Sequence, residues 1–547
     1  MLGLKAVNCH NGDLLAEEQV TASGKERVLN ALGDAAAKIR QKLGESLTSV
    51  EKYDTPLENV TTPSLEALQA FSLGYRAQLV KTDFTAAISL FQRAISLDPH
   101  FAMAYARLGA NYANLGETAR AAENTRKAYE LRERASEREK FYIDSHYEQF
   151  VAGDLEAARK TYELWAQTYQ RDEIPPSNLA VIYITLGEYG KSLAAEQQAL
   201  KLDPGRGQAI HPNLVVAYLC LNRLHEAKAT AREAQARNFD SPFIHLSLYL
   251  VAFQQHDPAG MEREAAWVMG KPGIEDVILY NESDTAAYAG QFVKARELTQ
   301  RAADSAQRND EKESAAGYEA EAALQEALVG NMGLARQQAQ AALALSEGRD
   351  VEAISAIALG LAGDAAQAIP LSNDLSKRFP KDTIVRSQYL PMIHTATILA
   401  RGNASEDADK AIQALAAAAP YELGCSRGNF NFNLYPAYLR AEAYLAAHQG
   451  SAAAAEFQKI LDRPGVVQNE PIGALAHLGL GRAYALEAGV GAGLVPARAQ
   501  RPQGAPLQSD ALGKARTAYE DFLALWKDAD PDIPILKQAK AEYAKLR

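Results

Sequence analysis

Cysteine is scarce in this chain, and long apolar runs are absent. The 547 residues include three cysteines, Cys9, Cys220 and Cys425, and none is spaced from another as in a C-x-x-C pair. This spacing argues against a thiol metal site or redox motif and predicts buried thiols. There is no run of about 18 apolar residues, and residues 1–13 lack the basic and apolar segments of a secretion signal. These absences predict no membrane insertion by this chain and no export signal.

An excess of positive charge is also lacking. Lysine and arginine number 57 against 68 aspartates and glutamates, which gives a formal net charge of −11. Proteins that bind nucleic acid concentrate positive charge against the phosphate backbone. We therefore expect no nucleic-acid partner.

Motifs of catalysis and cofactor binding are missing as well. His225-Glu226 begins like an H-E-x-x-H zinc motif, but Ala229 stands where the second histidine would have to be. The chain contains neither a G-x-S-x-G elbow nor a G-x-x-x-x-G-K-[ST] phosphate loop. Glu311 and Glu313 fall in a polar run that is typical of a solvated turn. We predict no catalytic residue, no metal and no cofactor, and hence that this chain is not an enzyme.

What the chain does contain is mostly strong helix formers, except near its start. Short apolar runs flank Asn11-Gly12, a dipeptide that suits a hairpin turn. Apolar residues then recur every three or four positions over residues 24–45, as on one face of a helix. A hairpin and one helix bury little surface by themselves. Residues 1–54 are therefore predicted to be the remnant of an upstream α/β domain, with residues 55–63 as a linker.

From residue 64 onward the sequence repeats at a period of about 34 residues. In residues 101–131 the recurring positions are aromatic or small: Tyr105, Leu108, Gly109, Tyr112, Gly116, Ala121 and Ala128. Gly109 and Ala121 would let two helices approach closely, and Gly116 would end the first helix. This order is close to the tetratricopeptide pattern. We predict an all-α fold, a right-handed solenoid of about twelve helical hairpins, with helix in more than about two-thirds of the chain and strand only in the first twenty-odd residues.

The repeats differ in regularity along the chain. Residues 64–270 hold the regular copies, one of which includes Leu179, Gly187 and Ala199. Residues 271–424 keep the turn glycines but lose the aromatic residues, and residues 425–547 return to clearer helix pairs. A stretch rich in glycine, proline and alanine at residues 489–509 has no helical period, so we expect a disordered insertion there.

Several phrases of the sequence are more specific than the repeat pattern. They include SLEALQAFSLG, DFTAAISLFQRAISLDPHFAMAYARLG, SEREKFYIDSHYEQFVAGDLEAARKTYELWAQTYQRD and PAYLRAEAYLAAHQGSAAAAEFQKILD. With these phrases the chain resembles the C-terminal tetratricopeptide region of bacterial eukaryotic-like serine/threonine protein kinases. The early NGDLLAEEQV and KIRQKLGES segments resemble the end of the domain that precedes the repeats there. A related architecture joins such repeats to a DNA-binding winged helix instead.

The kinase domain itself has no counterpart here. The chain lacks the glycine-rich loop with its strand lysine, H-R-D, D-F-G and A-P-E, the parts that hold ATP, magnesium and the substrate hydroxyl. The resemblance therefore implies two functions: a protein-interaction scaffold in signalling, or the sensory half of a kinase or regulator whose effector domain is elsewhere. It also leaves two compartments open, cytoplasmic for a complete chain and extracytoplasmic for the end of a membrane-anchored kinase.

The expected partner is a protein or peptide in the superhelical groove. In a solenoid of helix pairs, the first helix of each pair forms the inner wall. The repeat register places on this wall a mixture of polar and aromatic residues suited to a peptide: Arg76, Asn114, Tyr147, Phe150 and Thr185. Ordinary packing is the alternative interpretation of each. The two-carboxylate clamp of chaperone-binding relatives is not carried over, because Ala106, Ala110 and Val181 stand at its positions.

Overall fold

The computed structural model describes residues 1–8, 11–24, 27–45, 62–80, 82–401, 404–424, 433–490 and 506–546. Contacts divide the chain into two units. The first comprises Met1–Asn114 and Arg120–Val151, and the second comprises Leu115–Ala119 and Ala152–Arg547. Residues 55–61 of the expected linker and 491–505 of the expected insertion lie outside the described residues. The predicted domain boundaries stay predictions.

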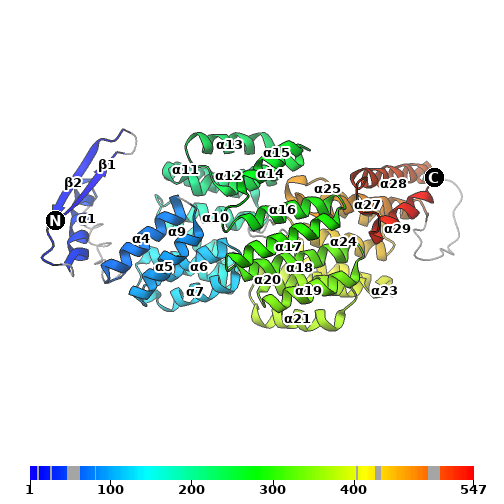
Figure 1. Ribbon diagram of the computed structural model, residues 1–547, viewed down its shortest axis with the longest axis horizontal. Helices are drawn as coiled ribbons and strands as arrows, with labels where there is room; N and C mark the ends of the chain where they lie inside the picture. The colour runs from blue at the N-terminus through cyan, green and yellow to red at the C-terminus, as the bar shows by residue number, and fades with distance from the viewer. Residues whose placement is uncertain are drawn as a thin grey trace. The chain divides into compact units, whose positions relative to one another are not determined.

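Helices make up 76% of the described residues. In this part of the chain, strand occurs in β1 (Leu2–Val7) and β2 (Leu14–Val20), which pair antiparallel from Leu2 opposite Val20. Helix α1 (Val28–Lys42) lies against both strands (Figure 1). The prediction of an all-α solenoid preceded by a small hairpin and a helix is confirmed.

The helices that follow α1, up to residue 152, are short and joined by tight turns. They are α4 (Leu65–Val80), α5 (Phe84–Leu97), α6 (Ala102–Asn114), α7 (Thr118–Glu130), η2 (Arg132–Arg134), α8 (Glu137–Tyr147) and the π-helical turn η3 (Glu148–Ala152). Local chemistry sets their starts. The Asp83 carboxylate accepts from the Ala86 N–H, and Ser136 and Glu139 form a reciprocal capping box.

Small residues bring α6 and α7 together, as the repeat pattern predicts. A side chain at Gly109 would collide with the Thr125 hydroxyl and the Ala121 carbonyl oxygen, so the two backbones approach closely there. Gly116, with a φ of 79°, lies in the turn between the helices. The glycines thus fix the geometry of the hairpin, and Phe91, Leu108 and Tyr112 fill its apolar interior.

The second unit continues the arrangement with more helices. They are α9 (Leu155–Thr168), α10 (Ile174–Thr185), α11 (Tyr189–Leu202), η4 (Pro204–Arg206), α12 (Gly207–Cys220), α13 (Leu224–Ala236), α14 (Pro242–Gln254), α15 (Pro258–Val268), α16 (Glu275–Tyr288), α17 (Phe292–Arg308), α18 (Lys312–Leu328), α19 (Met332–Leu345), α20 (Arg349–Leu361), α21 (Ala365–Arg378), η5 (Val385–Tyr389), α22 (Leu390–Leu399), α23 (Ala404–Leu415), η6 (Ala416–Ala418), α24 (Tyr435–Ala446), α25 (Gly450–Leu461), α26 (Pro464–Val467), α27 (Pro471–Glu487), α28 (Pro506–Leu525) and α29 (Pro534–Ala544). From α10 to α25 each even-numbered helix packs against its successor, and α27 packs against α28 (Figure 1).

Late segments of the second unit cover turns of its early helix pairs. Gly424 lies against the Thr185 carbonyl group at the end of α10, and Gly465 against that of Leu219 at the end of α12. The Trp526 indole N–H donates to the Tyr288 carbonyl oxygen at 2.9 Å, beside the turn between α16 and α17. Helix α27 also packs directly on α16 and on α24. The later repeats therefore fold back on the earlier ones and occupy part of their surface.

The start of helix α18 is acidic and buried, contrary to the prediction from the sequence. Glu311 and Glu313, expected in a solvated turn, are 3% and 5% exposed. Glu117 accepts from the Glu313 and Ser314 N–H groups at 2.9 and 3.2 Å, and Glu313 accepts from the Ala119 N–H at 2.9 Å. The expectation was wrong because the segment Leu115–Ala119, almost 200 residues away in sequence, covers this helix start.

In the described residues, no helix combines the length and the apolar character that a membrane crossing would require. The side chain of Cys220 is buried, as predicted for the thiols, whereas Cys9 and Cys425 lie outside the described residues.

Candidate functional site

The five predicted groove residues fall in different environments. In the first unit, Arg76 on α4 and Asn114 at the end of α6 are exposed, and Tyr147 and Phe150 are half-buried. In the second unit, Thr185 is half-buried at the end of α10, where its hydroxyl donates to the Val181 carbonyl oxygen at 3.1 Å. Because Gly424 lies against the Thr185 backbone, the chain itself covers this end of the helix.

Tyr147 belongs to a stack of side chains on the first unit. Its ring lies parallel to that of Tyr129, with centroids 4.0 Å apart, and the Arg132 guanidinium lies 3.6 Å from the centroid of Tyr129. Such a stack holds the Tyr147 ring in one orientation, since aromatic and cation–π contacts fix both faces of Tyr129. Tyr147 is thus a pre-oriented aromatic surface rather than a mobile one.

Phe150 does not continue the helix that carries Tyr147. Helix α8 ends at Tyr147, and the π-helical turn η3 holds Phe150. A π turn adds a residue per turn, so the α-helical register between positions 147 and 150 is lost. The Phe150 ring instead packs edge-on against His146, with centroids 5.4 Å apart. Sequence periodicity, which treats residues 141–150 as one helix, could not show this change.

The first unit also buries a cation, Arg107, between aromatic side chains. The Arg107 guanidinium carbon lies 4.8 Å from the ring centroid of Tyr75 and 4.2 Å from that of Tyr142. Burial, reinforced by the positive charge of Arg107, lowers the pKa of His146 to about 3. His146 is therefore a neutral ring at physiological pH, and its Nδ1 lies 2.8 Å from the Tyr142 carbonyl oxygen. Through His146, which stacks on Tyr142 and contacts Phe150, these packed side chains support the Phe150 ring.

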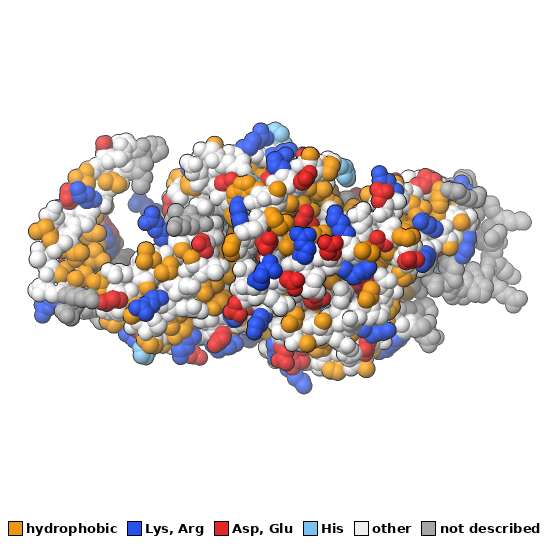
Figure 2. All heavy atoms as spheres, viewed as in Figure 1, with side chains coloured by type: hydrophobic (Ala, Val, Ile, Leu, Met, Phe, Trp, Pro, Cys, Tyr) orange, Lys and Arg blue, Asp and Glu red, His pale blue; other side chains and the backbone are white. Residues whose placement is uncertain are grey.

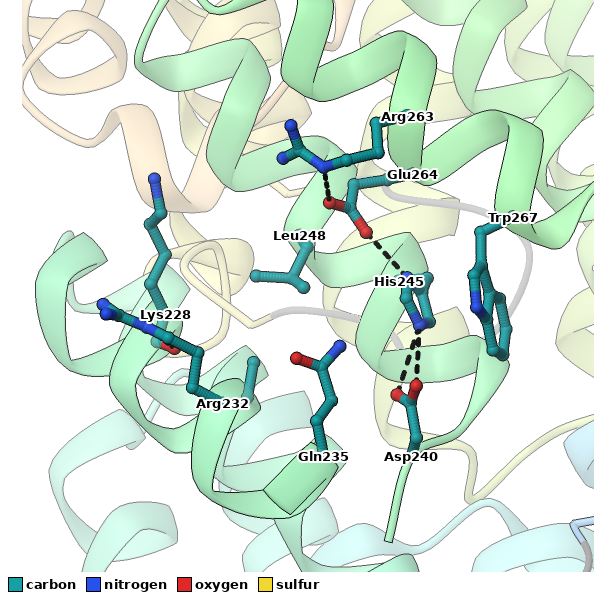
Figure 3. A pocket seen from close by; sticks show the side chains of 10 residues that line it. Lys228, Arg232, Gln235, Asp240, His245, Leu248, Arg263, Glu264 and Trp267 are labelled. Atoms are coloured by element: carbon teal, nitrogen blue, oxygen red, sulfur yellow. Dashed lines mark hydrogen bonds and ion pairs between the residues drawn. The ribbon is translucent and has the colours of Figure 1, made fainter. Parts of the chain in front are cut away.

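The second unit contains a cavity of about 460 Å³ among α13, α14 and α15 (Figure 3). Polar, charged and apolar side chains share its walls: Lys228, Ala231, Arg232, Gln235, Asp240, His245, Leu248, Arg263, Glu264 and Trp267. Sequence reasoning did not find it. The available signal was the one-turn spacing of Lys228 with Arg232 on α13 and of Arg263 with Trp267 on α15, which places each pair on one helix face.

His245 is the rigid centre of this pocket. Its Nδ1 lies 2.6 Å from a Glu264 carboxylate oxygen, and its Nε2 lies 3.2 Å from Asp240 (Figure 3). The ring also stacks on the Trp267 indole at a centroid distance of 3.6 Å. Burial alone would raise the pKa of Glu264, but its hydrogen bond to His245 and the charges of His245 and Arg263 lower it on balance. Glu264 is thus an ionised, fully engaged carboxylate.

A separate group of acidic side chains is buried where α16, α18, α24 and α27 meet. Asp284, Glu321 and Glu470 are each at most 2% exposed. Gln325 donates to Asp284 at 2.7 Å, and the Tyr435 hydroxyl donates to Glu470 at 2.9 Å. Burial raises the pKa of Asp284 to about 8, and burial together with the neighbouring carboxylates raises those of Glu321 and Glu470 well above the usual range. These groups are a protonated part of the interior.

Among the described residues, no three His, Cys, Asp or Glu side chains are grouped so that they could hold a metal ion. The absence of an enzyme activity stays a prediction.

Comparison with known proteins bears on the repeat itself. A family model described as a tetratricopeptide repeat matches residues 177–206, the segment that folds as α10, α11 and η4. This chain contains a tetratricopeptide repeat. The match includes Leu179, Gly187 and Ala199, three positions of the recurring set, so the tetratricopeptide assignment is confirmed there.

Other comparisons add little beyond the tetratricopeptide repeat. A solved structure titled "Crystal structure of MamA protein" is similar over 38% of this chain and 97% of its own, at 19% identity and a TM-score of 0.18. A similarity that weak supports no further argument. No curated protein matches the sequence. The kinase-region resemblance stays a prediction.

Proposed function

We propose that this chain is a protein-interaction scaffold that binds a protein or peptide partner through the aromatic surface of its first unit. The observation that carries the proposal is the stacked Tyr147 ring, half-buried and held by Tyr129, three residues before the half-buried Phe150 of η3. Aromatic side chains that are already held in place lose little conformational entropy on binding and often dominate the binding energy. Arg76 and Asn114 supply exposed polar groups on the same unit.

The fold of the second unit supports placing this contact on the first unit. Thr185, the predicted groove residue of the second unit, lies under Gly424, and later repeats cover neighbouring turns. A peptide would have to displace these segments of the chain to reach Thr185. We therefore assign the partner contact to Arg76, Asn114, Tyr147 and Phe150. Thr185 is left out of this contact, because Gly424 covers its end of α10.

The test is capture of the partner by purified protein. Proteins retained from native lysate would be identified by mass spectrometry, and the leading candidate purified and titrated by calorimetry. Replacing Tyr147→Ala together with Phe150→Ala should raise the dissociation constant by about tenfold or more. Leu164→Ala on α9 is the matched control, because it also removes a partly exposed apolar side chain, at 54% exposure, but in the second unit.

Circular dichroism and thermal melting separate binding from folding. The double variant should keep its helicity and melt within a few degrees of the wild type. Unfolding of the variant would show that both rings belong to the core. Unchanged binding by a folded variant would place the partner surface elsewhere and refute the assignment.

The second candidate is the sensory or regulatory half of a bacterial serine/threonine kinase or of a winged-helix regulator. It is favoured by the hairpin β1–β2 with α1 beside it, the segment that resembles the end of a preceding domain. Sequencing the upstream locus tests it. A frame with H-R-D and D-F-G motifs, whose product changes activity when this chain is added, would support the kinase form. An upstream frame with neither kinase motifs nor a winged helix would remove this candidate.

A further inference from the structure

The pocket among α13, α14 and α15 carries more positive than negative charge that is available to a ligand. Lys228 donates to the Gln255 side-chain oxygen at 3.0 Å, and the Arg232 Nε donates to the Lys228 carbonyl oxygen at 3.2 Å. Within the described part of the chain, neither cation forms an ion pair with a carboxylate. The guanidinium fork of Arg232, on an exposed side chain, is therefore open to a carboxylate from outside.

The carboxylates of the pocket are already engaged. Glu264 contacts His245 at 2.6 Å and the Arg263 Nε at 3.0 Å, and Asp240 contacts His245 at 3.2 Å (Figure 3). Each of these carboxylates therefore already has a hydrogen-bonding or ionic partner at short range. A ligand with a free carboxylate would therefore meet the uncompensated charge of Lys228 and Arg232, on the opposite wall, before any repulsion from Glu264.

This local charge differs from that of the chain as a whole. The chain has a net charge of −11, and on the face shown in Figure 2 lysine and arginine side chains are interspersed with aspartate and glutamate. The surface on this face therefore gives an acidic ligand little net attraction. A pocket with two unpaired cations selects for acidic side chains by contrast with its surroundings.

The pocket also has an apolar side. Trp267 is 37% exposed, with one ring face against His245 and the Lys271 ammonium close to the ring. Leu248 and Ala231 add aliphatic wall between α13 and α15. Because His245 and Lys271 occupy the two faces of the indole, an aromatic or leucine side chain of a ligand would contact the edge of the ring together with Leu248.

The position of the pocket keeps it separate from the covered surface of the second unit. Helices α13 and α15 are the second helices of consecutive pairs, and second helices form the outer layer of such a solenoid. Late segments cover the turns after α10, α12 and α16, but they do not fill this cavity, which has a volume of about 460 Å³. Its size lies within the range of roughly 300–1,000 Å³ typical of ligand sites.

We propose that this outer pocket binds an acidic peptide segment of a protein partner, with a carboxylate on Lys228 and Arg232 and an aromatic or leucine side chain against Trp267 and Leu248. The site does not involve the Tyr147 and Phe150 surface. An experiment can therefore refute the outer pocket as a binding site without refuting the Tyr147 and Phe150 surface, and the reverse also holds.

The fluorescence of Trp267 gives a local readout of binding. The chain has three tryptophans, and Trp165 and Trp526 are 1% and 2% exposed, so Trp267 is the one that responds to a ligand at the surface. The probe is an eight-residue peptide of glutamates with one central phenylalanine, titrated into the full chain at low salt. We expect saturable binding with a shift in tryptophan emission, lost in Trp267→Phe, and binding weakened by added salt.

Charge variants test the specificity. Lys228→Glu with Arg232→Glu should weaken binding of the acidic peptide by about tenfold or more without changing the melting temperature by more than a few degrees. Arg301→Glu, at an exposed arginine of α17, is the matched control and should bind as the wild type does. A lysine version of the peptide should not bind to the wild type, and should bind to the double glutamate variant at least as well as the acidic one does.

Each of the following results would overturn the proposal. The acidic peptide could bind no better than its lysine version, or equally well to the double glutamate variant. Binding could persist without any change in Trp267 emission, which would place the peptide elsewhere. Finally, free glutarate could match the peptide in affinity, which would make the ligand a small dicarboxylate. Binding that Tyr147→Ala with Phe150→Ala abolishes, while the charge variant leaves it intact, would assign the peptide to the first unit instead.

Discussion

Asp284, Glu321 and Glu470, three of the buried carboxyl groups of the second unit, make its stability depend on pH. Asp284 lies on α16 and Glu321 on α18, and Glu470 immediately precedes α27, so the group joins repeats that are far apart in sequence. Replacing Asp284→Asn removes one titrating group while keeping an oxygen that can accept from Gln325, now at 2.7 Å. The variant therefore tests the charge of the side chain with little change in its shape.

The sign follows from the direction of the shift. Burial raises the pKa of Asp284 from 3.8 to about 8 in the folded chain, so folding favours the protonated form. The stabilisation is complete below the unfolded pKa, near 4, and is lost as the pH rises through about 8. At about 1.4 kcal/mol per pKa unit, a shift of this size corresponds to an upper limit on the order of 6 kcal/mol. Because Glu321 and Glu470 share the effect, we expect the free energies of unfolding of the wild type and of Asp284→Asn to differ by about 2 kcal/mol or more at pH 8.

The assay is thermal and urea unfolding of the full chain between pH 5 and pH 8. The wild type should lose stability over this range, and Asp284→Asn should lose less, so that the variant is the more stable of the two at pH 8 and similar at pH 5. Asp409→Asn is the matched control, because Asp409 is exposed on α23. If the wild type and Asp284→Asn show the same pH dependence, the carboxyl group is solvated and the reasoning is refuted.

Three further predictions concern packing, buried charge and nucleotide binding. Gly109→Ala should destabilise the chain by about 1–3 kcal/mol in urea unfolding, because a methyl group would meet Thr125, whereas Gly513→Ala, with no atom within 4 Å, should be neutral or stabilising. Arg440→Ala should cost about 1–3 kcal/mol in the same assay, because it removes the nearly buried guanidinium that contacts Glu422 at 2.7 Å and leaves Lys459, at 2.9 Å, as the remaining cation at that carboxylate. Calorimetry with Mg-ATP should show no saturable binding at micromolar concentrations, because the phosphate-binding elements of kinases are missing from the sequence.

The fold could be predicted from the sequence because its strongest contacts are local. Gly109, Ala121 and Gly116 recur at fixed offsets, and each acts within its own helix pair, where a small side chain or a left-handed turn is required. The hairpin at Asn11-Gly12 is equally local. Periodicity therefore reports helix pairs and their turns reliably, and the tetratricopeptide match at residues 177–206 falls on one of the copies read this way.

Contacts between distant repeats left no such signal. Glu311 and Glu313 stand in a run of charged residues that is indistinguishable from a solvated turn until the segment Leu115–Ala119 covers it. Thr185 occupies an inner position by register, yet Gly424 covers it after a separation of more than 200 residues. Neither outcome is encoded within a 34-residue period, because the period describes what one repeat needs from its neighbours.

The candidate binding surfaces lie where the regular pattern is interrupted or leaves freedom. Phe150 is displaced from its expected register by a π turn, which repeat statistics read as ordinary helix. Lys228 and Arg232 occupy outer positions that the stacking of helices does not constrain, so their charge is free to serve a ligand. A solenoid separates these tasks: the small and aromatic residues that recur set the shape, and the residues that vary between copies determine what the shape binds. Function in this chain is therefore best sought at positions such as 150, 228, 232 and 267, where the copies differ, rather than at those that make the repeat recognisable.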